Sequence, residues 1–163
     1  MNRAHVGLFW LPLSAALAVI LGLVPLPDPA APLRPYFLAL VLVYWLLETP
    51  DKVGMGTAFG LGLIGDLAFG TLIGEQALRL TVLAWLVQRF RTRMRFFPLW
   101  QQSVVVFALL MNDRALAAVV HIAIGESLPH WTFWLSPLLA LPLWPWLVVM
   151  FDTLRMRARE RRR

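Results

Sequence analysis

The chain has 163 residues, of which 60% are hydrophobic and 15% are charged, with a formal net charge of +6 and a mean hydropathy of +0.69. This composition lies outside the range of soluble domains of this length and predicts that most side chains face lipid or one another. The chain contains no cysteine, which excludes disulfides, cysteine-based metal sites, iron–sulfur clusters and thiol catalysis.

The apolar runs predict an all-α membrane protein, a bundle of six transmembrane helices that forms one domain over residues 1–163. We expect spans at about 7–25, 34–49, 53–70, 74–90, 97–122 and 131–151. The first run is too long for the core of a signal peptide, so we expect it to remain as a span. The second run is the shortest, and its Tyr36, Tyr44 and Trp45 are residue types that suit the headgroup level of a bilayer.

Arginines gather in two clusters, one after the fourth run and one in the C-terminal tail. In a six-span protein both clusters lie on the side of the termini, which the positive-inside rule places in the cytoplasm. These arginines also predict contacts with anionic lipid, and the alternative is docking of an acidic cytoplasmic partner. Their position beside apolar runs argues against nucleic acid. The arginines concerned are Arg89, Arg91, Arg93, Arg95, Arg155, Arg157 and Arg159.

The third run carries small residues and one carboxylate at every fourth position, so that they share one helical face: Gly54, Ala58, Gly62, Asp66 and Gly70. In lipid, such a stripe lets one helix pack closely on another. A carboxylate at this depth needs a partner, and we expect it to be Arg79 in the fourth run. The pair is interpreted either as a structural clamp between two helices or as part of a ligand or partner site.

The fifth run places Asn112, Asp113 and Arg114 near the middle of an apolar stretch. Neighbouring residues of a helix point about 100° apart, so we expect Asp113 and Arg114 to find separate partners on other helices or chains. Three roles remain open for them: a proton or ion relay, a substrate site, or a buried polar junction.

The remaining polar residues show no pattern typical of catalysis or metal binding. The histidines lie in different segments without ligand spacing, and no serine or threonine is accompanied by a base in a nucleophile motif. We therefore expect neither a metal, nor a cofactor, nor an enzyme. An intramembrane acid–base enzyme stays as a minor hypothesis for the charges of the third and fifth runs.

Several strings together resemble the MreD family of rod shape-determining proteins. They are Arg34-Pro35, Val43-Tyr44-Trp45 followed by Pro50, the segment from Gly60 to Leu67 with Gly70 and Gly74 after it, the arginine-rich turn, and Trp100-Gln101-Gln102. The motif positions that carry over are Arg34, Pro35, Tyr44, Trp45, Pro50, Gly62, Gly65, Asp66 and Gly70.

The resemblance implies a non-enzymatic scaffold of bacterial cell-wall elongation in the inner membrane. It implies MreC, MreB, RodA and a class B penicillin-binding protein as partners, and a fold similar to the substrate-binding subunits of energy-coupling-factor vitamin transporters. The rival hypothesis is a small-molecule or lipid-binding membrane transport subunit, in which Asp66, Arg79, Asp113 and Arg114 converge on a ligand.

Overall fold

A computed structural model describes residues 3–27, 33–127 and 129–160 of the chain. Within these ranges it contains six α-helices, two short 3-10 helices and no strand, which confirms the all-α prediction. The elements are α1 (Arg3–Leu23), α2 (Phe37–Glu48), α3 (Met55–Phe69), α4 (Glu75–Met94), α5 (Leu99–Ala123), η2 (Trp131–Trp134), η3 (Ser136–Leu139) and α6 (Ala140–Glu160). The last predicted span therefore starts as two 3-10 turns, and only its second part is α-helical.

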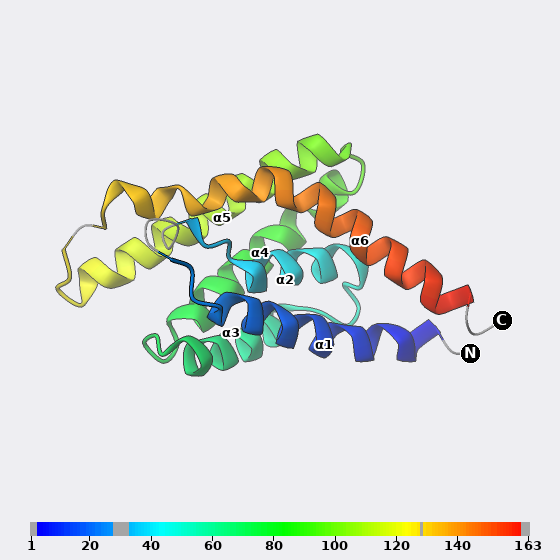
Figure 1. The fold of residues 1–163 in the computed structure, drawn as a ribbon, viewed down its shortest axis with the longest axis horizontal. Helices are drawn as coiled ribbons and strands as arrows, with labels where there is room; N and C mark the ends of the chain where they lie inside the picture. Colours follow the sequence, from blue (N-terminus) through cyan, green and yellow to red (C-terminus); the bar gives the residue numbers. More distant parts are fainter. Residues whose placement is uncertain (1–2, 28–32, 128, 161–163) are drawn as a thin grey trace.

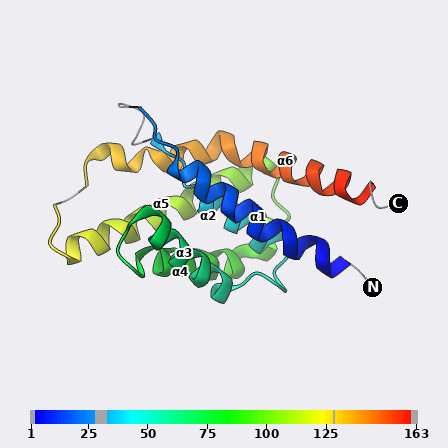
Figure 2. The same cartoon turned by 60° about the horizontal axis from the view of Figure 1, so that its bottom comes forward.

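The helices form an elongated bundle (Figures 1 and 2). The first turns of α1 and the last turns of α6 lie at the same end of the bundle, together with the connections α2–α3 and α4–α5 (Figure 1). The connections α1–α2, α3–α4 and α5–α6 lie at the opposite end. An even number of chain passes from end to end produces this alternation.

The helices differ in their ability to cross a bilayer. In the described part of the chain, two helical stretches are long and apolar enough to span a membrane, Leu99–Ala123 and Trp131–Leu154. Shorter apolar helices are Trp10–Leu23, Phe37–Glu48 and Met55–Phe69. At about 1.5 Å per residue, α2 is only about 18 Å long, less than the ~30 Å of a hydrocarbon core.

The short helix α2 is the core of the bundle. Residues 38–47 are all buried, and α2 contacts α1, α4, α5 and α6. Tyr44 and Trp45 are 2% and 1% exposed, so both pack inside the bundle, and their expected depth at the headgroup level stays a prediction. Each ring donates one hydrogen bond of 2.8 Å inside the bundle, Tyr44 to Oδ1 of Asp152 and Trp45 to Oγ of Ser14. A buried aromatic ring with a polar atom needs such a partner, and the surrounding helices provide it.

Helices α3 and α4 have the most extensive contact in the bundle, and small residues allow it. A Cβ atom at Gly62 would lie 2.2 Å from Cα of Ala77, so the two backbones touch there. Ala58 is fully buried on the same face.

The two ends of the predicted stripe have other roles. Gly54 precedes α3 and would make only an ordinary contact with Gln88 of α4. Gly70 ends α3 in the left-handed conformation, with φ of 66°, and a Cβ there would meet nothing within 4 Å. Its predicted packing role is wrong, because glycine is needed here for the backbone turn that terminates the helix.

Candidate functional site: a polar network at one end of the bundle

Asp66 is the buried carboxylate of α3, with 1% of its surface exposed. Its Oδ2 accepts hydrogen bonds from the main-chain N–H groups of Gly74 at 2.8 Å and Ala77 at 3.4 Å. Its Oδ1 accepts from the N–H of Gln76 and the hydroxyl of Thr71, both at 2.8 Å. The first N–H groups of a helix have no partner within it and carry partial positive charge. Asp66 therefore caps the N-terminus of α4 from a neighbouring helix.

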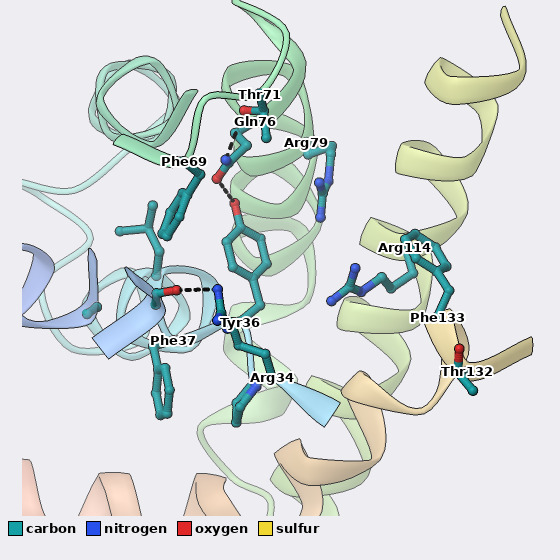
Figure 3. Close-up of a pocket in the computed structure, with 14 residues that line it drawn as sticks. Arg34, Tyr36, Phe37, Phe69, Thr71, Gln76, Arg79, Arg114, Thr132 and Phe133 are labelled. Carbon is teal, nitrogen blue, oxygen red and sulfur yellow. Dashed lines mark hydrogen bonds between the residues drawn. The ribbon is translucent and has the colours of Figure 1, made fainter. Parts of the chain in front are cut away.

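Gln76 extends this cap toward α2. Its Nε2 donates to Oγ1 of Thr71 at 3.1 Å, and its Oε1 accepts a hydrogen bond of 2.8 Å from the hydroxyl of Tyr36 (Figure 3). Tyr36 directly precedes α2, and its ring centroid lies 5.2 Å from Cζ of Arg79, a cation–π distance. One hydrogen-bonded chain thus joins α3, α4 and the start of α2.

Arg79 of α4 pairs with α5 and not with α3. Its Nε donates to Oδ1 of Asp113 at 3.1 Å, its Nη2 pairs with Oδ2 of the same carboxylate, and its Nη1 lies 3.2 Å from Oε1 of Glu75. The expected pair of Asp66 with Arg79 is wrong, because the α4 N-terminus already satisfies Asp66 and the planar guanidinium matches the Asp113 carboxylate in a fork. Asp113 is 1% exposed, so this ion pair is a buried junction of α4 and α5.

Arg114 points away from Asp113 and finds its own partners, as predicted. Its Nη2 donates to Oγ of Ser136 in η3 at 2.9 Å, and Cζ lies 4.6 Å from the ring centroid of Phe133 in η2. Among the described side chains no carboxylate forms an ion pair with Arg114. Asn112 is exposed and does not join the network.

Arg34 connects the ends of α1 and α2. Its Nη1 and Nη2 donate to the main-chain carbonyls of Gly22 and Val24, both at 2.8 Å, at the point where α1 ends. Its own carbonyl accepts a hydrogen bond of 2.7 Å from Ser136. Its Nε is buried and has no hydrogen-bond partner in the described part of the chain.

A cavity of about 520 Å³ lies among these groups (Figure 3). Residues of α1, α2, α3, α4, α5 and η2 and of the segments before α2 and α4 line it, including three arginines, Arg34, Arg79 and Arg114. Among the described residues, its lining contains no aspartate or glutamate and includes the rings of Phe37 and Phe69. The described lining is therefore both cationic and apolar.

The sequence-predicted residues all belong to this half of the molecule, but in three separate junctions: Asp66 with the start of α4, Arg79 with Asp113, and Arg114 with η2 and η3. Sequence reasoning missed Tyr36, Gln76 and Ser136 as members. A polar Gln76 at the start of an apolar run was the available signal for one of them. Tyr36 and Ser136 gave no signal, since isolated residues of these types are common near helix ends.

The arginine clusters lie at the other end of the bundle. Arg89, Arg93 and Arg95 are exposed near the turn between α4 and α5, and Arg157 is exposed on α6. Arg91 is half-buried, and its Nε donates to the carbonyl of Leu47 at 3.4 Å. The side chains of Arg155 and Arg159 lie outside the described part of the structure.

Two helices long and apolar enough to span a membrane, large hydrophobic side chains exposed on the surface and paired charges inside are typical of a membrane protein. The family described as rod shape-determining protein MreD matches residues 3–154. The rod shape-determining protein MreD of Haemophilus influenzae is 32% identical over 143 residues, which cover 88% of each chain. The chain belongs to the MreD family.

Family membership gives the protein a role in rod shape determination and an association with the shape-determining machinery. MreD is a shape-determining structural protein and not a known enzyme family. No solved structure matches the chain. The similarity to energy-coupling-factor subunits therefore stays a prediction.

The family positions fall on structurally distinct places. Arg34 and Pro35 line the cavity, Tyr44 and Trp45 lie in the core, and Pro50 is in the turn after α2. A Cβ atom at Gly65 would lie 2.8 Å from Oε1 of Gln76, so this glycine makes room for the polar network.

Proposed function

We propose that this protein is a non-enzymatic scaffold of the bacterial cell-wall elongation complex, which maintains rod shape by binding MreC and linking it to MreB, RodA and a class B penicillin-binding protein. The observation that supports this role is how the interior charges are used. The Asp66 carboxylate accepts three main-chain hydrogen bonds at the start of α4 and one from the hydroxyl of Thr71, and Asp113 is held by the fork of Arg79. Such groups fix the packing of helices, which a binding platform requires.

We further propose that all six helices cross the inner membrane with both termini in the cytoplasm. The alternation of connections between the two ends and the arginines near the end that holds the termini support this orientation (Figure 1). The short α2 fits because other helices surround it, so its length does not have to match the bilayer. At the cytoplasmic end, the arginines of the two clusters would contact anionic lipid.

The cysteine-free sequence makes this topology testable with single cysteines. Ile73→Cys lies in the α3–α4 connection and Phe96→Cys in the α4–α5 connection, at residues that are 80% and 84% exposed. We expect a membrane-impermeant maleimide to label position 73 in intact spheroplasts and position 96 only after the membrane is opened. Labelling of both positions in intact spheroplasts would refute the six-span arrangement.

The MreC contact is testable by disulfide crosslinking to a cysteine in the MreC transmembrane helix. The scan starts on the outward face of α3, where Leu67 is 75% exposed and a Cβ at Gly56 or Gly60 would meet nothing within 4 Å. The matched position on another helix is Val149 of α6, which is 55% exposed. We expect crosslinks on one face only. Equal crosslinking from every exposed helix, or from none, contradicts a defined MreC site.

Mutations test whether the interior junctions support the assembly. We expect Asp66→Ala and Asp113→Ala to lower co-purification with MreC and to cause loss of rod shape, because each leaves buried donors or a buried cation without a partner. Asn112→Ala is the control, since this exposed side chain neighbours Asp113 on the same helix. Wild-type complex yield and cell shape in both aspartate mutants would contradict the role given to these residues.

The second candidate is a small-molecule or lipid-binding membrane transport subunit. The cavity beside Arg34, Arg79 and Arg114 favours this candidate, because a scaffold alone needs no cavity lined by arginines. Detection of a stoichiometric small molecule in the purified protein would support this candidate.

A further inference from the structure

The charges around the cavity do not balance. Arg34, Arg79 and Arg114 line it, and the described residues of the lining include no carboxylate. The positive charge of Arg79 is neutralised by Asp113 and Glu75, which are not among the lining residues. The other two arginines have main-chain carbonyls, one hydroxyl and an aromatic ring as partners, none of which carries a full negative charge. A guanidinium that is partly withdrawn from water is stabilised when an anion joins it.

Hydrogen-bond donors are also left over. A guanidinium has five N–H bonds, and Arg114 donates a hydrogen bond through Nη2 to Ser136. The guanidinium of Arg114 points toward the side of the cavity where Tyr36 and Arg79 lie (Figure 3). Nε of Arg34 is buried without a partner in the described structure. Buried donors of this kind are normally satisfied, so an acceptor belongs here.

Part of the cavity lining is apolar. Ala18 of α1, Leu38 of α2 and the rings of Phe37 and Phe69 form this part. A volume of about 520 Å³ is much more than a lone phosphate needs and falls in the range of sites for larger ligands. A ligand that fills the whole cavity therefore has an anionic group beside an apolar part.

We propose that this cavity binds the phosphate group of an anionic amphiphile. The phosphate lies between Arg34 and Arg114, and the apolar part lies against Phe37 and Phe69. Arginine is the residue that best matches phosphate oxygens with paired N–H donors. An anionic phospholipid supplies both parts in a membrane. Lipid binding at this site does not depend on MreC, so it can fail or succeed separately from the scaffold function.

The test uses the full-length protein purified without partners. Native mass spectrometry compares retention of phosphatidylglycerol with that of phosphatidylcholine, and thermal unfolding with added inorganic phosphate tests the anion alone. The variants are Arg114→Gln, which removes a cation, and Ala18→Phe, which adds a ring at a lining residue of α1 and keeps every charge. The control is Lys52→Gln, which removes one positive charge in the α2–α3 turn, far from the cavity lining.

We expect wild type and Lys52→Gln to retain one phosphatidylglycerol in preference to phosphatidylcholine. Arg114→Gln should weaken this binding about tenfold, the effect of one lost hydrogen bond to a charged group. The variant with the added ring should weaken it by a similar factor because the ring competes with the ligand for space. Equal retention of both lipids by wild type, or equal loss in Lys52→Gln and in the cavity variants, overturns the proposal. Protection by inorganic phosphate equal to that by the lipid would keep the anion site and overturn its assignment to an amphiphile.

Discussion

The close approach of α3 to α4 at Gly62 predicts a large effect from one added methyl group. In Gly62→Ala the new Cβ would lie 2.2 Å from Cα and 2.5 Å from the main-chain nitrogen of Ala77. Ordinary carbon–carbon contacts are about 3.5–4.0 Å, so the helices must separate by roughly 1.3 Å or more. The atoms that must move are backbone of α4, which a change of side-chain rotamer cannot relieve.

The separation also reaches the cap that Asp66 provides one turn further along α3. Its hydrogen bond to the N–H of Gln76 is 2.8 Å, and lengthening it by about 1 Å takes it out of hydrogen-bond range. Overpacking costs about 1–3 kcal/mol. One lost hydrogen bond to a charged group adds about 1.5–3 kcal/mol. We expect Gly62→Ala to lower the free energy of unfolding by about 2.5–6 kcal/mol.

The assay is thermal unfolding of the purified protein in detergent, with Gly60→Ala as the matched control two positions earlier on the same helix. A Cβ at Gly60 would meet nothing within 4 Å, and alanine is the better helix former by about 0.5–1 kcal/mol. We expect a lower melting temperature for Gly62→Ala, by about 5–20 °C, and an unchanged or slightly higher one for Gly60→Ala. Equal melting temperatures for the two variants would refute the close backbone contact.

Three further changes test the interior junctions by the same unfolding assay. Asp66→Asn removes the negative charge that faces the start of α4 and should cost about 1–2 kcal/mol; a stability equal to wild type would argue against the capping role. Arg79→Met leaves the buried Asp113 unpaired and should lower the free energy of unfolding by about 3–5 kcal/mol. Adding Asp113→Leu should recover part of this loss. Strict additivity of the two changes would show that the pair is not coupled. Trp45→Phe loses its buried hydrogen bond and should cost about 1–2 kcal/mol, while Trp85→Phe at a 54% exposed position should change stability by less than about 0.5 kcal/mol.

Run lengths and charges were enough to predict the helical class and the approximate position of the helices, because each turn between the apolar runs carries proline, glycine or charge. The same data did not show which helices are neighbours. Asp66 and Arg79 lie on consecutive helices, yet Arg79 pairs with Asp113, which lies 34 residues further on. Helical periodicity predicts which residues share a face, and it carries no information about the partner helix.

The position of α2 was missed for a related reason. Lipid and the interior of a helical bundle are both apolar, so a buried helix and a lipid-facing helix have the same composition. Tyr44 and Trp45 are equally typical of a headgroup region and of a core with polar partners. Only the contacts with Asp152 and Ser14, far away in the chain, distinguish the two environments.

The central position of α2 has a consequence for biogenesis. Tyr44 and its acceptor Asp152 are 108 residues apart. At about 5–20 residues per second, the ribosome therefore synthesises Asp152 roughly 5–20 s after Tyr44. During that interval α2 is a short segment whose final neighbours are not yet all made. Helix α6 is synthesised after α2 and completes the set of helices that surround it. In a chain truncated before α6, one side of α2 would therefore lack its packing partner.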